Sequence, residues 1–573
     1  MNRLFTPFSV DTVPLNEYPR PQLERDSFFN LNGIWDYSLK SPASISEGKI
    51  LVPFSPESIL SGVEQLVLPS DILAYKKVFN LPNGFIKDRV FINFGAVDYF
   101  SEVFCNGKKV GENRGGYFPF SCDITDSIFE DKENTLEVIV LDPTDLGTQA
   151  RGKQRLKRGG IFYTPQSGIW QTVWLESVPK TYIKNIKLTP DIDKETIRIS
   201  VETNAPVTVK AKISFKGTAV EDISFSGECD IKIKNAKLWC PDSPNLYDLT
   251  LTAGEDEVKS YFGMRKFSIG TDKEGFNRLF LNNEPCFHNG LLDQGYFPDG
   301  LYTPPSDEAM VYDIKTAKEM GFNMLRKHIK IEPLRWYYHC DRLGMLVWQD
   351  MINGGSGANT PENGIRGFLG IKTKDFGSRG YKRTGRTCEQ GRNEFFEETE
   401  KTISTLYNSV SLCLWVPFNE SWGQFDALKV YDFVKKQDNT RPIDHASGWH
   451  DQGGGDFKSL HIYFRKVKIK KDNRPIILSE FGGYSVKVPN HVFNNDKAFG
   501  YKKFKTTEDF SKAYKLLYEN EIIPLINKGL SATVYTQITD VEDEINGLIT
   551  YDRKIIKIPM DTLREINSKL VLL

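Results

Sequence analysis

Residues 412–424 read Leu-Cys-Leu-Trp-Val-Pro-Phe-Asn-Glu-Ser-Trp-Gly-Gln, and this segment indicates how the C-terminal half of the chain folds. Its first residues are apolar, as in a strand buried on both faces, and the apolar run ends at Asn419 and Glu420. A carboxylate at the end of a buried strand is unfavourable unless it is hydrogen-bonded or takes part in chemistry. We therefore expect Glu420 to act in catalysis at the mouth of a barrel.

Strand and helix patterns alternate on both sides of this segment. Strands are predicted at residues 322–326, 344–348, 412–417, 459–463, 476–479 and 532–535. Helices are predicted at residues 307–321, 332–343, 392–407, 425–437 and 511–527. About eight such units predict a (β/α)8 barrel. The alternative is an open doubly wound sheet, which would usually carry a glycine-rich phosphate turn after a strand, and the sequence has none.

The N-terminal half carries short β-rich runs separated by turn residues. Runs at 89–94, 101–105 and 134–141, with the hairpin signal Asn106-Gly107, predict a β-sandwich from about residue 31 to 178. The alternation resumes between residues 181 and 270, and its length and strand spacing predict a second, smaller sandwich of immunoglobulin-like kind.

Composition narrows the range of partners. The 74 basic and 75 acidic residues give a net charge of −1, so we expect no nucleic-acid partner. The eight cysteines form no Cys-x-x-Cys pair, which predicts reduced, buried thiols. Residues 1–7 lack the apolar stretch of a signal peptide, and no segment has a membrane-spanning length. These features predict a soluble, cytoplasmic protein that does not bind membranes.

A second predicted strand also ends in a glutamate, in the segment Ser479-Glu480-Phe-Gly. Because reacting groups of (β/α)8 barrels lie at the C-terminal ends of strands, Glu420 and Glu480 are expected to face one cavity. Such a pair can cleave an acetal: one carboxyl group protonates the leaving oxygen, and the other attacks the anomeric carbon or activates water. The alternative for either glutamate alone is a structural salt bridge with a neighbouring Arg or Lys.

Other catalytic classes lack their sequence signals. The histidines at 288, 328, 445, 450 and 461 have no helical His-x-x-x-His spacing, and no Gly-x-Ser-x-Gly nucleophile elbow is present. We therefore expect no metal site and no cofactor.

The order of several fragments resembles glycoside hydrolase family 2, and the match runs nearly end to end. The fragments include residues 52–57, 106–120, 167–170, 322–328, 419–420 and 479–482. The resemblance implies a jelly-roll sugar-binding-like domain at 1–180, an immunoglobulin-like domain at 181–271 and a catalytic barrel at 272–573. Residues 408–411 read Asn-Ser-Val-Ser where many members have His-Pro, which affects a loop. We also expect no further C-terminal sandwich domains.

The resemblance implies that Glu420 is the general acid/base and Glu480 the nucleophile of a retaining enzyme. Asn419 would then bind the 2-hydroxyl of the sugar, Arg326 would orient Glu480 and hold it ionised, and Tyr463 would donate a hydrogen bond to it. Further substrate-binding candidates are His328, His461, Asp293, Asp350, Trp449, Trp422 and Tyr535, with Gln294 and Gln537 beside them. The alternative for the histidines is a satisfied place in the core, and for each tryptophan it is barrel packing.

The sugar is the open part of this interpretation. β-Glucuronidases of the family bind the sugar carboxylate with an Asn-x-Lys pair after the final strand, whereas residues 540–544 here are acidic and would repel a uronate. An Asn495-Asp-Lys497 triplet occurs one strand earlier. We therefore predict a β-galactosidase-like exo-glycosidase, with a β-glucuronidase or β-galacturonidase as the alternative. A hypothesis of another class is a non-hydrolytic carbohydrate-binding protein. The resemblance leaves a homo-oligomer open.

Overall fold

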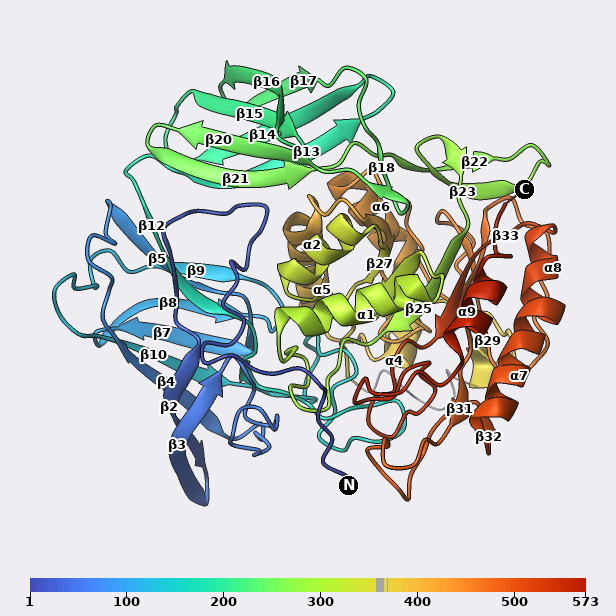
Figure 1. The fold of residues 1–573 in the computed structure, drawn as a ribbon. Coiled ribbons are helices and arrows are strands. Elements are labelled where there is room, and N and C mark those ends of the chain that lie inside the picture. The colour runs from blue at the N-terminus through green and yellow to red at the C-terminus, as the bar shows by residue number, and fades with distance from the viewer. Residues whose placement is uncertain (357–364, 368, 573) are drawn as a thin grey trace.

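The computed structural model describes residues 1–356, 365–367 and 369–572, and three bodies of secondary structure follow one another along the chain (Figure 1). The N-terminal body, blue to cyan in Figure 1, lies beside the barrel. The second body, green, lies across one end of both. The predicted architecture of two β-sandwiches and a barrel is confirmed.

The N-terminal body is a sandwich of two antiparallel sheets. The first sheet has the order β1 (Phe28–Asn30), β12 (Val173–Val178), β5 (Arg89–Phe94), β9 (Phe120–Asp123). The second has the order β3 (Ser44–Val52), β2 (Gly33–Ser41), β4 (Ile72–Phe79), β10 (Asn134–Leu141), β7 (Phe100–Cys105), β8 (Lys108–Arg114). Alternate residues of β10 are buried, because successive side chains of a strand point to opposite faces. β11 (Gly168–Ile169), at the end of the loop that leaves β10, pairs with the earlier short strand β6 (Val97–Asp98).

The second body is a smaller sandwich, which also consists of two antiparallel sheets. Its sheets have the orders β13 (Ile183–Asp191), β14 (Thr196–Thr203), β17 (Glu228–Lys232) and β16 (Thr218–Phe225), β15 (Val209–Phe215), β20 (Tyr247–Ala253), β21 (Asp256–Phe262). The strands β18 (Trp239–Cys240) and β19 (Ser243–Pro244), then β22 (Phe267–Thr271), β23 (Asn277–Leu281) and β24 (Glu284–Pro285), lead from it into the barrel.

The third body is a curled parallel sheet surrounded by helices. Its order is β28 (Leu412–Val416), β27 (Leu346–Asp350), β26 (Met324–Lys327), β25 (His288–Asp293), β33 (Leu530–Thr536), β30 (Ile476–Gly482), β29 (Lys458–Ile462). Residues 443–447 make parallel bridges to β28, at Trp415 and Asn419. Side-chain hydrogen bonds link the same segment to Ser459 and His461 of β29, so it takes the eighth place and closes the barrel.

The sequence analysis gave no range for two of the barrel strands, β25 and this eighth segment, and the eighth segment has the weaker sequence pattern. It follows Pro442 and contains Asp444, His445 and Ser447, so it has neither an apolar run nor an alternating pattern. The segment is extended because it lies between β28 and β29, although its own residues do not favour a strand.

The predicted helices are present with shifted ends. They are α1 (Asp307–Glu319), α2 (Leu334–Leu343), α5 (Glu389–Leu406), α6 (Ala427–Gln437) and α7 (Thr507–Leu517). The last continues through a π-helical turn, η1 (Tyr518–Ile522), into α8 (Ile523–Ile526); α4 (Gly377–Thr384) and α9 (Met560–Asn567) were not predicted. Ser306 and Thr506 cap α1 and α7 by accepting a backbone N–H, and Gly344 ends α2 in a left-handed conformation. No helix in the described ranges is both long and apolar enough to cross a membrane.

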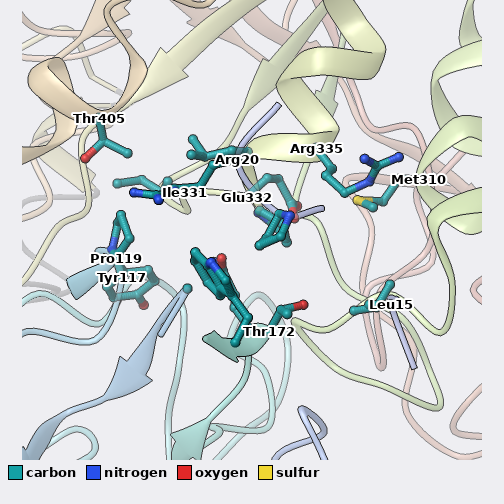
Figure 2. A pocket seen from close by; sticks show the side chains of 16 residues that line it. Leu15, Arg20, Tyr117, Pro119, Thr172, Met310, Ile331, Glu332, Arg335 and Thr405 are labelled. Atoms are coloured by element: carbon teal, nitrogen blue, oxygen red, sulfur yellow. The ribbon is translucent and has the colours of Figure 1, made fainter. Parts of the chain in front are cut away.

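A narrow cleft of about 30 Å³ lies at the seam between the N-terminal sandwich and the barrel helices (Figure 2). Arg20 and Tyr117 come from the sandwich side, and Met310 and Arg335 from α1 and α2. Ligand pockets usually measure about 300–1,000 Å³, so we interpret this cleft as a packing gap between domains. None of the predicted site residues lines it.

Candidate active site

Glu420 and Glu480 lie together at the C-terminal end of the barrel strands. Glu420 follows β28, and Glu480 lies near the end of β30. Both are buried, with 8 % and 4 % of their surface exposed. One side-chain oxygen of each, and one ring nitrogen of His461, all lie within 4.8 Å of one another. The fold therefore brings the two predicted carboxylates into direct reach of one small group.

Glu480 is held by strong hydrogen-bond donors. Arg326 Nη1 donates to Glu480 Oε1 at 3.1 Å, and the Tyr463 hydroxyl donates to Oε2. Arg326, fully buried on β26, also donates to both oxygens of Asp350, at 2.9 and 3.1 Å. Burial alone would lower the pKa of Arg326, but the carboxylates of Asp350 and Glu480 outweigh it and raise that pKa. Glu480 therefore accepts hydrogen bonds from a permanent cation and from a phenol.

Glu420 has a different environment. Its Oε1 lies 2.7 Å from His461 Nδ1, and its backbone takes a left-handed conformation, with φ of +46°, that turns the chain sharply after the strand. Burial raises the pKa of Glu420 to about 7, against the opposing charges of Lys153 and Arg326. A substantial fraction of this carboxyl group is therefore protonated near neutral pH.

His461 joins the two carboxylates. Its Nε2 lies 3.0 Å from Ser447 Oγ and 3.7 Å from Glu480 Oε1, while its Nδ1 faces Glu420. Burial lowers the pKa of His461 to about 4, so the ring is neutral and only one of its nitrogens carries a proton. Which nitrogen is protonated then decides whether His461 donates to Glu420 or accepts from it.

A row of three serine hydroxyls, the serine relay, settles this choice. Ser447 Oγ lies 3.0 Å from Ser479 Oγ, which lies 2.6 Å from Ser459 Oγ, and Ser459 donates to Asp444 Oδ2 at 2.7 Å. Burial raises the pKa of Asp444 to about 6, which leaves it mainly ionised and able only to accept at neutral pH. Each hydroxyl therefore donates toward Asp444, Ser447 accepts from His461 Nε2–H, and Nδ1 is left to accept a proton from Glu420.

The other polar candidates lie at or just after the C-terminal ends of the barrel strands. Asn419 Oδ1 accepts from Arg326 Nη2 at 2.9 Å. Asp350 Oδ2 lies 2.7 Å from His328 Nδ1, and burial lowers the pKa of His328 well below its ordinary value. Asp293 accepts from Lys327 Nζ at 2.7 Å, and that ammonium lies 4.3 Å from the ring centroid of Trp336 on α2. Because Leu292 packs inside the barrel, its neighbour Asp293 faces the helices and not the carboxylate pair. Gln294 donates to Gln537 at 2.8 Å.

Two tryptophans lie at the mouth. Trp422 stacks on Phe162 of the N-terminal sandwich, with ring centroids 5.4 Å apart. Trp449 is half-buried, its ring 6.5 Å from that of His461. A cavity of about 520 Å³ is lined by Trp449, His461 and Tyr463 among others, and two of these residues, His461 and Tyr463, also contact the carboxylates. Neither Glu420 nor Glu480 lines this cavity itself.

Tyr535 is, with Asp293, one of two candidates that the structure does not bring to the site. Its ring packs against Phe481, Tyr514 and Tyr518, in the core between the sheet and α7. The reason is strand alternation: Val534 of β33 packs inside the barrel with other strand residues, so its neighbour Tyr535 must face the helices.

The N-terminal sandwich contributes a residue that the sequence analysis missed. The loop between β10 and β11 reaches the barrel mouth and places the Lys153 ammonium over the rings of Tyr163 and Trp422, at 5.4 and 5.8 Å. Of the neighbouring charges, Lys153 opposes the rise in the pKa of Glu420 most strongly. A basic run in a loop is the only sequence signal for it, and that signal does not say where the loop lies. Ser447, Ser479 and Asp444 were also missed, because the sequence does not say which side chains of separate strands meet.

The acidic run after the final strand is already paired. Asp540 accepts from Lys557 at 2.6 Å. Glu542 accepts from the Thr164 backbone at 2.9 Å, and Glu544 accepts from the Tyr163 hydroxyl. These carboxylates bind cations and donors of the protein itself, so the run by itself is no argument against an anionic sugar.

The spacing of Glu420, His461 and Glu480 would also suit a cation. However, the ligand atoms of a metal site must be free to point their lone pairs at the ion. Here Glu480 already accepts hydrogen bonds from Arg326 and Tyr463. The two ring nitrogens of His461 face Glu420 and Ser447. The hydrogen bonding fits proton transfer better than it fits metal binding.

Comparison with known proteins identifies the family of each part of the chain. The family model for the sugar binding domain of glycosyl hydrolases family 2 matches residues 69–179, a second model of this family matches 181–265, and the model for its TIM barrel domain matches 305–555. A β-galactosidase of Leuconostoc mesenteroides is 25 % identical over 71 % of this chain and 40 % of its own length. One of Lactococcus lactis is 24 % identical over 81 % of this chain and 48 % of its own. The chain thus spans less than half the length of these relatives.

Solved structures show the same fold over nearly the whole chain. A β-D-glucuronidase of Dictyoglomus thermophilum superposes with a TM-score of 0.75 and 18 % identity, over 96 % of this chain and 98 % of its own. A β-galacturonidase from Eisenbergiella tayi bound to galacturonate gives 0.69 and 16 %, over 96 % and 99 %. With consecutive family models on all three bodies and paired glutamates at the barrel mouth, this chain belongs to glycoside hydrolase family 2.

Proposed function

We propose that this protein is a retaining exo-β-glycosidase that hydrolyses terminal β-linked sugars by double displacement. The observation that carries the proposal is the short separation of the two carboxylates, whose nearest oxygens lie within 4.8 Å. Retaining glycosidases hold these groups about 5–5.5 Å apart, whereas inverting enzymes leave about 6.5–9.5 Å for a water molecule. The different surroundings of the two carboxyl groups support the proposed roles of Glu480 as nucleophile and Glu420 as acid/base.

In the first step, Glu480 attacks the anomeric carbon. A bond forms between its carboxylate oxygen and that carbon, the glycosidic bond breaks, and Glu420 gives its proton to the leaving oxygen. The Arg326 and Tyr463 donors hold the Glu480 carboxyl group in position for attack, and burial raises the pKa of Glu420 to about 7, so that it can carry the proton it gives.

In the second step, the ionised Glu420 takes a proton from water as the water oxygen attacks the anomeric carbon. The ester bond to Glu480 breaks, and a sugar of retained configuration leaves. Asn419 is the candidate partner for the 2-hydroxyl, because Arg326 fixes its carbonyl oxygen and so leaves its amide N–H groups to face the cavity. The proposed steps use this chain's own side chains and require no cofactor.

We propose a set of candidate sugars and not a single one. The relatives named above are β-galactosidases by sequence, and the structural neighbours are a β-glucuronidase and a β-galacturonidase. The sequence argument for a neutral, β-galactoside-like substrate depended on an acidic run that the protein itself pairs with Lys557, Thr164 and Tyr163. A β-galactoside and the two uronides therefore form the substrate panel.

Turnover of 4-nitrophenyl β-galactoside, β-glucoside, β-glucuronide and β-galacturonide tests the proposal. We expect at least one to be hydrolysed, with the β-anomer formed first in the proton NMR spectrum. An α-anomer formed first would exclude double displacement. Binding of these sugars without turnover of any would support the non-hydrolytic carbohydrate-binding protein instead.

A further inference from the structure

The loop between β10 and β11 is a built part of the barrel mouth. We call residues 151–158 of this loop the basic loop, since five of these eight residues are Arg or Lys. Its start is fixed where the backbone N–H groups of Arg151 and Gly152 donate to the Asn353 carbonyl, at 3.0 and 3.1 Å. Just beyond its end, Thr164 and Tyr163 donate to Glu542 and Glu544 of the barrel. The loop is therefore held at both ends against the barrel.

The basic residues of this loop differ in how they are satisfied. Arg158 forms an ion pair with Glu542 at 3.3 Å, and Arg155 one with Asp145 at 3.8 Å. Arg151 donates to backbone carbonyls, including that of Gly355 at 2.6 Å, and Lys157 is exposed to water. Each of these four residues thus has a protein partner or solvent.

Lys153 has no such protein partner. Its residue is only 6 % exposed, and within the described parts of the chain its ammonium forms no hydrogen bond and no ion pair. The faces of Tyr163 and Trp422 attract the charge, but they accept none of its three N–H groups in a hydrogen bond. These donors are therefore left to solvent or to a ligand, and an oxyanion of a ligand would accept from them in a charge-assisted hydrogen bond.

The charge of Lys153 acts on the catalytic cavity. Among charged groups, it is the strongest influence on both Glu420 and His328, and it lowers the pKa of each. Trp422, over which Lys153 lies, comes two residues after Glu420 in the sequence. The unpaired donors therefore belong to the space in which the substrate of the proposed glycosidase would sit.

We propose that Lys153 binds an anionic oxygen group of the substrate, a carboxylate or a sulfate ester, and that the enzyme prefers β-glycosides carrying such a group. This inference rests on the proposed glycosidase function. The shared chemistry is an oxyanion that accepts from the ammonium, and its source is either the sugar or the leaving group. A charge-assisted hydrogen bond made in this buried place discriminates strongly against a neutral substrate.

The test compares charged and neutral substrates on the same enzyme preparation. 4-Nitrophenyl β-galacturonide and β-galactoside 6-sulfate are set against β-galactoside, and β-glucuronide against β-glucoside. A neutral β-galactoside of a carboxylated phenol carries the charge on the leaving group instead. For the wild type we expect a higher kcat/KM on the charged substrate of a pair than on the neutral one. If the charged sugars show this preference, the anion belongs to the sugar; if the carboxylated phenol shows it, the anion belongs to the leaving group.

Three variants locate the effect. For Lys153→Met, which keeps much of the stem and removes the charge, we expect kcat/KM on the preferred anionic substrate to fall about 100-fold and on its neutral partner no more than about threefold. Lys153→Arg should restore most of the selectivity. Lys157→Met removes an exposed charge from the same loop and should change neither value. Because selectivity is a ratio measured on one preparation, a partly unfolded variant does not alter it.

Equal losses on charged and neutral substrates in Lys153→Met would overturn this inference and make Lys153 a residue that only tunes Glu420. A wild type that prefers neutral substrates would overturn it as well, while leaving the proposed function intact. If the wild type hydrolyses none of these substrates, the proposed function itself fails.

Discussion

The ends of β28 and β30 present the same side chain to one cavity, yet they prepare it for opposite tasks. Glu480, on β30, receives an arginine N–H and a phenol O–H. Glu420, after β28, faces the ring nitrogen of a neutral histidine, and burial raises its pKa to about 7. In the proposed mechanism, these surroundings distinguish the nucleophile from the acid, although the two side chains are identical.

The largest expected effect is at β30. Glu480→Gln removes the atom that bonds to the anomeric carbon, so we expect kcat to fall by at least about 10⁴-fold on good and poor leaving groups alike. Mass spectrometry with a 2-fluoro-sugar substrate should find the covalent glycosyl adduct on the wild type and none on the variant. An adduct on another residue would reverse the comparison of the two strand ends.

At β28 the expected effect depends on the leaving group. Glu420→Gln should reduce kcat/KM about 10³-fold on an alkyl glycoside, but less than about tenfold on a dinitrophenyl glycoside, which needs little protonation. Azide should restore turnover of the activated substrate and give a β-glycosyl azide. Equal losses on both substrates would refute the acid role.

The pH dependence sharpens this second test. Since burial raises the pKa of Glu420 to about 7 and its acid role requires the proton, kcat/KM of the wild type should fall as the pH rises through about 7. For dinitrophenyl glycosides this alkaline decrease should be weaker. In Glu420→Gln it should be absent.

A smaller effect is expected from the donor that holds Glu480. Tyr463→Phe removes one of its two hydrogen bonds, and we expect kcat to fall about 100-fold, with less change in KM. Tyr535→Phe is the matched control. The Tyr535 ring faces the helices, so removal of its hydroxyl group should leave kcat within about twofold of the wild-type value. Equal losses in the two variants would mean that Tyr463 acts through packing alone.

The smallest effect concerns the serine relay. In Asp444→Asn the fixed acceptor becomes a group that also donates, so His461 can carry its proton on Nδ1 and donate to an ionised Glu420. This stabilises the ionised form of Glu420 and lowers its pKa. We expect the alkaline decrease of kcat/KM to move to lower pH and the maximum to fall about tenfold; Ser459→Ala should move it in the same direction. A pH profile that keeps its position would disprove the relay.

Much of the architecture followed from local patterns. The apolar runs before Glu420 and Glu480 predicted two buried strands, and the strands and helices that were predicted between residues 307 and 535 lie within a few residues of their observed ends. The strand at residues 443–447 was missed because polar side chains and Pro442 hide it, and it lies on the sheet only because β28 and β29 leave that place. Tyr535 was assigned to the site although alternation along β33 turns it away.

By itself, the sequence determined the barrel, the two sandwiches and the two strand-end glutamates, because a buried strand and an unfavourable carboxylate at its end are both local features. Only the tertiary structure decided how those glutamates differ. Arg326, Tyr463, His461 and the serine relay come from separate strands, and Lys153 comes from another domain. Their effects on charge and proton position arise from distances between segments far apart in the chain, and folding alone sets these distances.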